Sequence, residues 1–221
     1  MSTYGQFCPV AMASEVLTER WTPLVLRELL SGSTRFNDLR RGVPLMSPTL
    51  LAKRLRTLER VGVVERNGPE YVLTAAGEEL GPVVEALGLW GQRWARSDLE
   101  AKHFDASLLM WEVRRSIVVE RLPDRRVVVL FRLAGSIDAK SRFWLVVSPG
   151  EVDLCLADPG HEVDVIVTGH VRTMIEYWMG DVEFVDAVRS GALSVDGPAS
   201  LVRALPTWFA RSRFAGVSSA R

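Results

Sequence analysis

One stretch of the sequence, residues 47–73, constrains the fold more than any other. Ser47 can accept a hydrogen bond from the free amides of a first helical turn, and Pro48 suits that turn because no amide hydrogen is needed there. Gly62 suits the left-handed residue that ends many helices. These start and stop signals predict one helix of about fourteen residues.

The predicted helix has two unlike faces. Leucines recur at helical spacing on the face that we expect to pack, namely Leu51, Leu55 and Leu58. Polar and basic side chains occupy the opposite face, namely Thr49, Lys53, Arg56 and Arg60. Such a helix can enter a DNA groove, or it can be an ordinary amphipathic helix whose charged face only meets water.

A β-hairpin is predicted directly after this helix. Residues 63–66 and 71–73 are rich in β-branched and aromatic side chains, and they flank Asn67-Gly68, a dipeptide that tolerates the positive φ angles of a tight turn. A capped basic helix followed at once by a hairpin is typical of a winged helix-turn-helix. In that fold the helix enters the major groove and the hairpin lies against nearby backbone.

Three shorter helices are predicted before residue 47. The first starts near Pro9 and runs to Leu17, and the third covers residues 35–42 ahead of a turn at 43–46. The second covers residues 21–30 and stops at Gly32; its expected inward residues are Trp21, Leu24, Val25 and Leu29. Helix, turn, recognition helix and wing therefore follow one another along the chain.

Length and charge indicate two domains with a local basic patch. The 221 residues suit two domains, which we place at 1–98 and 99–221. The formal net charge is zero. However, residues 33–66 hold eight Lys or Arg against three acids, whereas residues 151–196 hold ten acids against two Arg. Local potential steers phosphate binding, so the neutral total does not argue against a nucleic-acid partner.

A further helix is predicted from Thr74, which can act as its N-cap, with a bend at Gly81-Pro82. Its apolar residues form a wide surface: Leu80, Val83, Val84, Leu87, Trp90 and Trp94. A small winged helix cannot cover so much apolar area. We therefore predict a homodimer interface here, with packing against the second domain as the alternative; both can hold.

Several motifs resemble one family when they are taken together. Cys8-Pro9-Val10, Glu19-Arg20-Trp21-Thr22, residues 35–39, residues 47–51 and residues 71–77 resemble, in order, the HxlR family of bacterial transcriptional regulators over about residues 7–97. The resemblance implies a dimeric winged-helix protein that binds double-stranded DNA. It implies a groove-entering helix end made of Ser47, Pro48, Thr49, Leu50, Lys53 and Arg54. Arg35 and Arg66 become expected phosphate contacts from the turn and the wing.

The division of labour on this helix also follows from general rules. Side chains near the N-terminal end of a recognition helix reach base edges, so we expect Thr49 and Lys53 to read sequence. Arg56 and Arg60 lie nearer the other end and should favour the DNA backbone. Thr49 can instead be an ordinary first-turn helix residue.

The second half of the chain is predicted to be an α+β domain. A helix is expected at residues 108–113. Strands are expected at 126–133, 142–147, 152–156 and 163–168, separated by turns such as Ser148-Pro149-Gly150. Helices follow at 172–179, 183–190 and 199–209. Overall the predicted fold class is α+β, with a winged helix-turn-helix first.

The end of this domain resembles the sterol carrier protein-like fold over about residues 105–210. The resemblance rests on residues 164–169, Met179-Gly180-Asp181 and residues 187–197, which close in a G-x-L-x-V-x-G segment. It implies an apolar tunnel for a lipid or similar small molecule. The expected lining is Trp111, Phe131, Trp144, Met174, Trp178, Trp208 and Phe209, although large aromatics are more often plain core.

The sequence favours neither catalysis nor a metal or cofactor. It has no phosphate-cradling glycine loop, no nucleophile elbow and no paired histidines at metal spacing, so we expect no enzyme, no cofactor and no metal. Cys8 and Cys155 lie too far apart in sequence to suggest a disulfide framework. No apolar run is long enough for a bilayer, so we expect no membrane partner and a soluble, cytoplasmic protein.

The sequence therefore predicts a homodimeric transcriptional regulator, a repressor, that reads a palindromic operator and responds to a small apolar effector in its second domain. One alternative is a redox or electrophile sensor through Cys8, because a thiol at a helix N-terminus can have a lowered pKa. Cys8 can equally be a small buried hydrophobe. A different class of alternative is a lipid or metabolite carrier whose winged helix mediates protein contacts.

Overall fold

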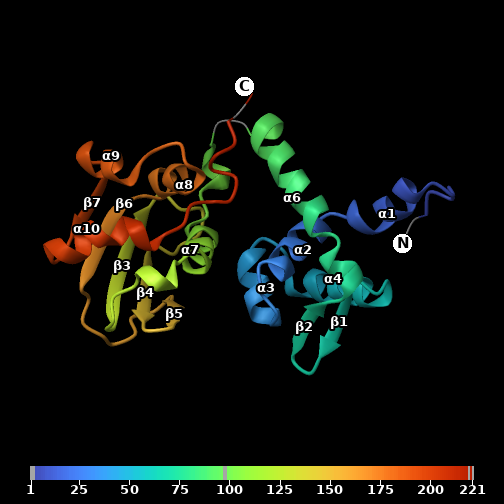
Figure 1. Cartoon of the computed structure of the whole chain (residues 1–221), viewed down its shortest axis with the longest axis horizontal. Helices are drawn as coiled ribbons and strands as arrows, with labels where there is room; N and C mark the ends of the chain where they lie inside the picture. Colours follow the sequence, from blue (N-terminus) through green and yellow to red (C-terminus); the bar gives the residue numbers. More distant parts are fainter. Residues whose placement is uncertain (1–2, 97–98, 219, 221) are drawn as a thin grey trace. The chain divides into compact units, whose positions relative to one another are not determined.

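The computed structural model describes residues 3–96, 99–218 and 220. The chain forms two compact units, Met1–Gly91 and Gln92–Arg221 (Figure 1). Within the described ranges, no helix is both long and apolar enough to cross a membrane.

The first unit is a helical body with a two-stranded wing. Its elements, in chain order, are α1 (Pro9–Leu17), α2 (Thr22–Leu30), α3 (Phe36–Gly42), α4 (Pro48–Arg60), β1 (Val64–Asn67), β2 (Glu70–Leu73), α5 (Ala75–Glu78) and α6 (Gly81–Trp90). The π-helix η1 (Gly91–Ala95) follows α6, and all of it except Gly91 belongs to the second unit. The helix predicted from Thr74 is thus two helices, because α5 ends at Glu78 and α6 begins at Gly81, with Pro82 in its first turn.

A core of branched aliphatic side chains joins α2, α3 and α4. Leu26, Leu39, Leu51, Leu55 and Leu58 have no exposed surface. The prediction for α2 was wrong in one residue, since Leu24 is exposed and Leu26 is buried in its place. Positions 22, 25, 26 and 29 follow one helical stripe, and position 24 lies outside it.

The wing turns one residue later than predicted. In the antiparallel register, Asn67 pairs with Glu70, so Gly68 and Pro69 form the two-residue loop. Gly68 has φ +58°, the positive value that a tight hairpin turn needs. A bridge between Arg35 and Glu70, with a 2.8 Å bond from the Tyr71 amide to the Thr34 carbonyl, fastens the wing to the start of α3.

The second unit is a mixed five-stranded sheet with helices. Its helices are η2 (Ala101–His103), α7 (Ala106–Arg115), η3 (Val119–Arg121), α8 (Val171–Met179), α9 (Phe184–Arg189) and α10 (Ala199–Trp208). Its strands are β3 (Val127–Ala134), β4 (Arg142–Ser148), β5 (Glu151–Cys155), β6 (Val165–His170) and β7 (Leu193–Asp196). The strand order is β5-β4-β3-β6-β7, with β3 and β6 parallel and the other pairs antiparallel.

The two faces of this sheet carry separate apolar clusters. Val127, Val129, Phe131 and Leu133 face the main core, to which helices α7 to α10 all contribute side chains. Alternate residues of the same strands, Val128, Leu130 and Trp144, form a smaller cluster on the other face. The main core therefore lies between the sheet and the helices.

Candidate nucleic-acid interface

The recognition helix α4 begins as its sequence predicts. The Ser47 hydroxyl accepts a 3.3 Å hydrogen bond from the Leu50 amide, and Pro48 occupies the first helical position. Gly62, just beyond the helix, has φ +74°. The N-cap prediction is thus confirmed, and it fixes where the helix starts relative to the wing.

The two faces of α4 separate as the leucine spacing indicates. Leu51, Leu55 and Leu58 have no exposed surface, and they hold the helix on the core of the unit. Four side chains point to solvent on the other side: Thr49, Lys53, Arg56 and Arg60. Leu50 is half-buried and packs against the core, so it supports this face more than it contributes to it.

The prediction that Arg54 belongs to the groove-entering end of the helix is wrong. Only 7% of this residue is exposed, because it lies on the leucine side of α4. Its guanidinium forms an ion pair with the Glu19 carboxylate and donates to the Arg20 carbonyl at 3.2 Å. Burial lowers the pKa of the Arg54 guanidinium. Arg54 therefore serves the interior of the unit.

Of the two arginines expected to contact phosphates, Arg66 lies in the wing, and Arg35 lies beside the wing at the start of α3. The Arg66 Nε donates to the Gly68 carbonyl at 3.1 Å, and its guanidinium lies 5.6 Å from the Tyr71 ring centroid. Arg35 forms an exposed ion pair with Glu70, with 3.4 Å between Nε and Oε1. Both arginines are exposed, and each contacts a residue of the wing.

Sequence reasoning left out two contributors to this region. Arg40 is exposed in the last turn of α3, and it adds to the basic surface of the unit. Glu19 pairs with Arg54 across the unit. The basic count of residues 33–66 already included Arg40, whereas nothing in the sequence marked Glu19 as a partner of α4.

The predicted dimer face divides into two parts. Leu80 and Val84 pack partly against the core of the first unit. Val83, Leu87 and Trp90 are exposed, and α6 has no buried residue among its members. Trp94, in η1, is also exposed. Figure 1 shows α6 projecting away from the body formed by α2, α3 and α4, so an apolar helix face is left uncovered.

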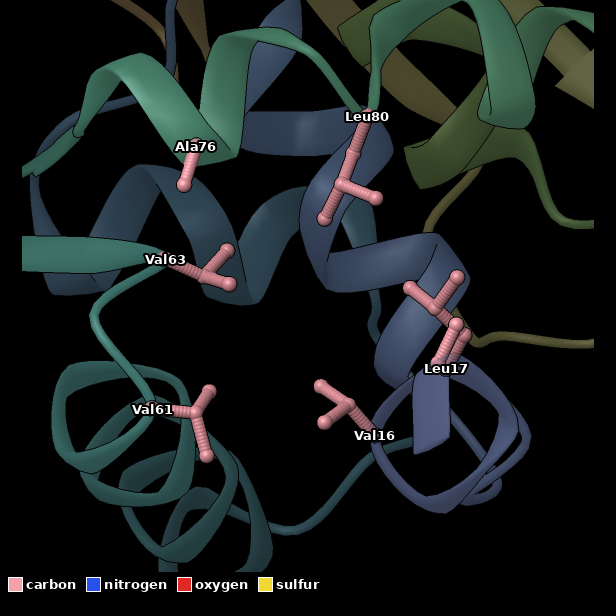
Figure 2. A pocket seen from close by; sticks show the side chains of 7 residues that line it. Val16, Leu17, Val61, Val63, Ala76 and Leu80 are labelled. Carbon is pink, nitrogen blue, oxygen red and sulfur yellow. The ribbon is translucent and has the colours of Figure 1, made fainter. Parts of the chain in front are cut away.

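A hollow of about 160 Å³ lies beside α1 in the same unit. Figure 2 shows Val16 and Leu17 of α1 on one side of it and Val61, just after α4, on another. Val63, Ala76 and Leu80 complete most of the apolar lining, together with Ala13. Side chains therefore do not fill the space between α1 and the end of the recognition helix.

Cys8 occupies the N-cap position of α1. It is half-buried, and both it and Cys155 are free thiols. In the described part of the chain, its side chain makes no capping hydrogen bond to α1. Across those same residues, no three His, Cys, Asp or Glu side chains gather as they would to hold a metal ion.

The structure does not bring all the expected lining residues of the second unit together. Phe131, Met174, Trp208 and Phe209 belong to the main core, and Trp178 packs against it. Trp144 was placed wrongly, because strand alternation puts it on the opposite face of the sheet. Trp111 is buried outside the main core, with the Arg114 and Arg115 guanidinium carbons 5.2 and 5.8 Å from its ring centroid.

Comparison with known proteins places the first unit. The family described as HxlR-like helix-turn-helix matches residues 16–99. A regulator of Synechocystis, described as an uncharacterized HTH-type transcriptional regulator, is 36% identical over 115 residues, which cover 49% of this chain and 82% of that protein. The similarly described YvaP of Bacillus subtilis is 34% identical over 98 residues, covering 41% of this chain and 91% of YvaP.

Solved structures also match part of the chain. The quinone-bound YodB from B. subtilis is 34% identical, covers 38% of this chain and 97% of its own, and gives a TM-score of 0.36. Both curated relatives exceed 30% identity, and this chain spans more than two thirds of each. The chain belongs to the HxlR-like helix-turn-helix family.

Proposed function

We propose that the protein is a homodimeric transcriptional regulator, a repressor, that binds a palindromic DNA operator. One observation carries the proposal: α4 is capped at Ser47, held by three fully buried leucines, and presents Thr49 and Lys53 to solvent at its N-terminal end. That is the end of a recognition helix that reaches base edges. The family relatives are named as transcriptional regulators, which supports the same function.

Specificity and affinity come from different side chains in this proposal. Thr49 and Lys53 read bases in the major groove, because they lie near the start of α4. Basic side chains around this helix contact phosphates and supply affinity that falls as salt concentration rises, namely Arg35, Arg56, Arg60 and Arg66. Ser47 and Pro48 set the position of the helix end.

A second copy of the chain covers α6 in the proposed dimer. The exposed side chains of Val83, Leu87, Trp90 and Trp94 provide its apolar contact. A two-fold symmetric dimer presents two recognition helices, which matches two half-sites of a palindrome. The packing of Leu80 and Val84 on the core ties this interface to the winged helix.

The second unit is proposed to be a sterol carrier protein-like domain that receives a small apolar effector on the helix side of its sheet. The main core there includes Phe131, Met174, Trp208 and Phe209, all apolar side chains between sheet and helices. The effector changes operator affinity only to the extent that it prefers one arrangement of the dimer over the other. Native mass spectrometry of the purified dimer, followed by denaturing release, tests for such a passenger.

A second candidate function is thiol-based sensing at Cys8. Its thiol is free and occupies the N-cap position of α1, and reactive cysteines occur at helix N-termini. Titration of the rate of Cys8 alkylation against pH tests this. A thiolate that forms only in the ordinary range for cysteine would remove the sensor function.

Selection of duplexes from a random DNA pool tests the main proposal. The wild-type protein should enrich an inverted repeat with its half-site centres about one helical turn apart or a multiple of this. Enrichment should be lost when Lys53 is changed to Ala. A pool that stays random after several rounds would contradict operator recognition, and it would favour a carrier whose winged helix contacts proteins.

A further inference from the structure

Arg54 points away from the DNA-facing side of α4 and toward the turn that joins α1 to α2. Its guanidinium pairs with the Glu19 carboxylate and donates to the Arg20 carbonyl at 3.2 Å. The Arg54 Nε is buried and has no hydrogen-bond partner among the described residues. The polar contacts of this buried guanidinium are thus concentrated on one short segment, residues 18–21.

That segment has an unusual backbone. Trp21 has φ +80°, and no other non-glycine residue in the described ranges has a positive φ. A bulky residue adopts this conformation only where its surroundings hold it there. The Trp21 ring packs against the core of the unit, and the Arg20 guanidinium lies 5.5 Å from its centroid. Arg54 holds the same turn from the side of the recognition helix.

Helix α1, on the far side of the turn, is loosely packed except at its end, where Val16 and Leu17 pack against the core of the unit. None of its residues is buried, and Val10 and Met12 are largely exposed. The hollow in Figure 2 separates Val16 of α1 from Val61 after α4, so apolar contact does not fill the space there. The turn and the Arg54 guanidinium are therefore one route by which a displacement of α1 would reach α4.

We infer that Arg54 is a positioning residue, which sets the orientation of the recognition helix by holding it to the α1–α2 turn through Glu19 and the Arg20 carbonyl. The Arg54 side of this ion pair is buried, and a buried charge does not tolerate the loss of its partner, so the pair fixes geometry even where it adds little net stability. The inference rests on the proposed DNA-binding function. In this role Arg54 does not contact DNA.

The salt dependence of DNA binding distinguishes a positioning role of Arg54 from a direct contact between Arg54 and a phosphate. Fluorescence anisotropy measures the dissociation constant for the selected operator and for a scrambled duplex between about 50 and 200 mM salt. The proteins are the wild type, Glu19→Gln, Arg54→Gln, the double variant and Arg56→Gln. Glu15→Gln is the matched control, since Glu15 lies one turn earlier in α1 and accepts hydrogen bonds from Thr3 and Tyr4.

Positioning predicts that Glu19→Gln and Arg54→Gln each weaken operator binding about tenfold and leave the salt slope unchanged. The double variant should be no weaker than the worse single variant, because both singles remove one shared interaction. Scrambled DNA should bind within about twofold of the wild type. Arg56→Gln should lower the salt slope by about one, as a lost phosphate contact does.

Three results would overturn the inference: a lower salt slope for Arg54→Gln, additive losses in the double variant, or tighter binding by Glu19→Gln. Tighter binding is what removing an acid near phosphate would produce. Should Arg54→Gln fail to fold, Glu19→Gln carries the test, since 37% of the Glu19 side chain is exposed.

Hydrogen exchange gives a readout that does not depend on DNA. Glu19→Gln should speed amide exchange in residues 18–22 and in the first turns of α4, whereas Glu15→Gln should not. If wild-type protein binds no duplex, the proposed function fails, and exchange alone decides the positioning role. Unchanged exchange in α4 would then refute it.

Discussion

Arg35 and Glu70 form an ion pair, with 3.4 Å between Nε and Oε1, that joins the start of α3 to the second strand of the wing. The pair is exposed, so its own contribution to stability is small, about 0–1 kcal/mol. Its acid, however, lies beside an arginine that we propose contacts phosphate. Glu70 therefore weakens the positive potential at the wing.

Glu70→Gln should strengthen DNA binding about two- to fivefold at low salt, because it leaves Arg35 without a competing carboxylate. Anisotropy titration against operator and scrambled duplexes measures this. Glu78→Gln, in α5, is a control that changes the net charge equally. Weaker binding by Glu70→Gln would mean that the pair is needed to hold Arg35 in place.

Substitutions of Ser47 can distinguish its role as the N-cap of α4 from its proposed role at the DNA-facing end of the helix. Ser47→Ala removes the bond to the Leu50 amide and should lower the free energy of unfolding by about 1 kcal/mol. Ser47→Asp keeps a capping oxygen, so its stability should match the wild type, but it places a negative charge at the groove-facing end. Its operator affinity should fall about tenfold or more. Urea denaturation and anisotropy, on the same samples, give the two quantities.

The apolar face of α6 makes a prediction about assembly. Leu87→Lys places a charge in the proposed interface, where burial without a partner is costly, and it should shift the protein from dimer to monomer. Glu85→Lys introduces a lysine two positions earlier on the same helix and should leave the dimer intact. Sedimentation equilibrium distinguishes the two. Dimers that persist in both variants would place the interface elsewhere.

Asp105 predicts a pH dependence in the second unit. Its carboxylate caps α7 by accepting from the Leu108 amide at 2.9 Å, yet burial raises its pKa above the usual value. The folded state therefore binds a proton more tightly than the unfolded state does. Asp105 therefore contributes to the free energy of unfolding at pH values below its pKa in the unfolded protein, about 4. This contribution is lost as the pH rises through the pKa of Asp105 in the folded protein.

Asp105→Asn keeps a capping side chain and cannot ionise. It should be more stable than the wild type at neutral pH, and the difference should shrink as pH falls into the acid range. Thermal unfolding between about pH 4 and 7 measures this. An Asn variant that is less stable at neutral pH would show that the ionised carboxylate is needed as the cap.

Much of the first unit is predictable because its local signals agree with one another. In residues 47–62, cap, leucine spacing and glycine stop all indicate the same helix, and α4 spans Pro48–Arg60. The sequence also indicates the face of α4 on which Arg54 lies. Arg54 lies three residues after Leu51 and four before Leu58, so helical spacing alone places it on the packed face. Its charge suggested solvent, and the Glu19 carboxylate that makes burial tolerable could not be seen in the sequence.

The second unit shows a different limit. Strand positions near β3 to β6 follow from β-branched runs, but those runs are apolar on both faces, so alternation alone does not say which face meets the helices. Trp144 and Phe143 are neighbours in β4, and they belong to different clusters. Which face of the sheet the helices cover depends on the topology of the whole unit, in which β3 lies beside both β4 and β6.

Operator recognition by α4 is tested most directly by one comparison. Wild type, Lys53→Ala and Lys140→Ala are titrated against the selected operator and a scrambled duplex; Lys140 is an exposed lysine of the second unit. Lys53→Ala should lose about 1–3 kcal/mol of binding free energy on the operator and much less on scrambled DNA. Lys140→Ala should match the wild type on both. Equal loss on both duplexes, or no loss for Lys53→Ala, would contradict base reading by this helix.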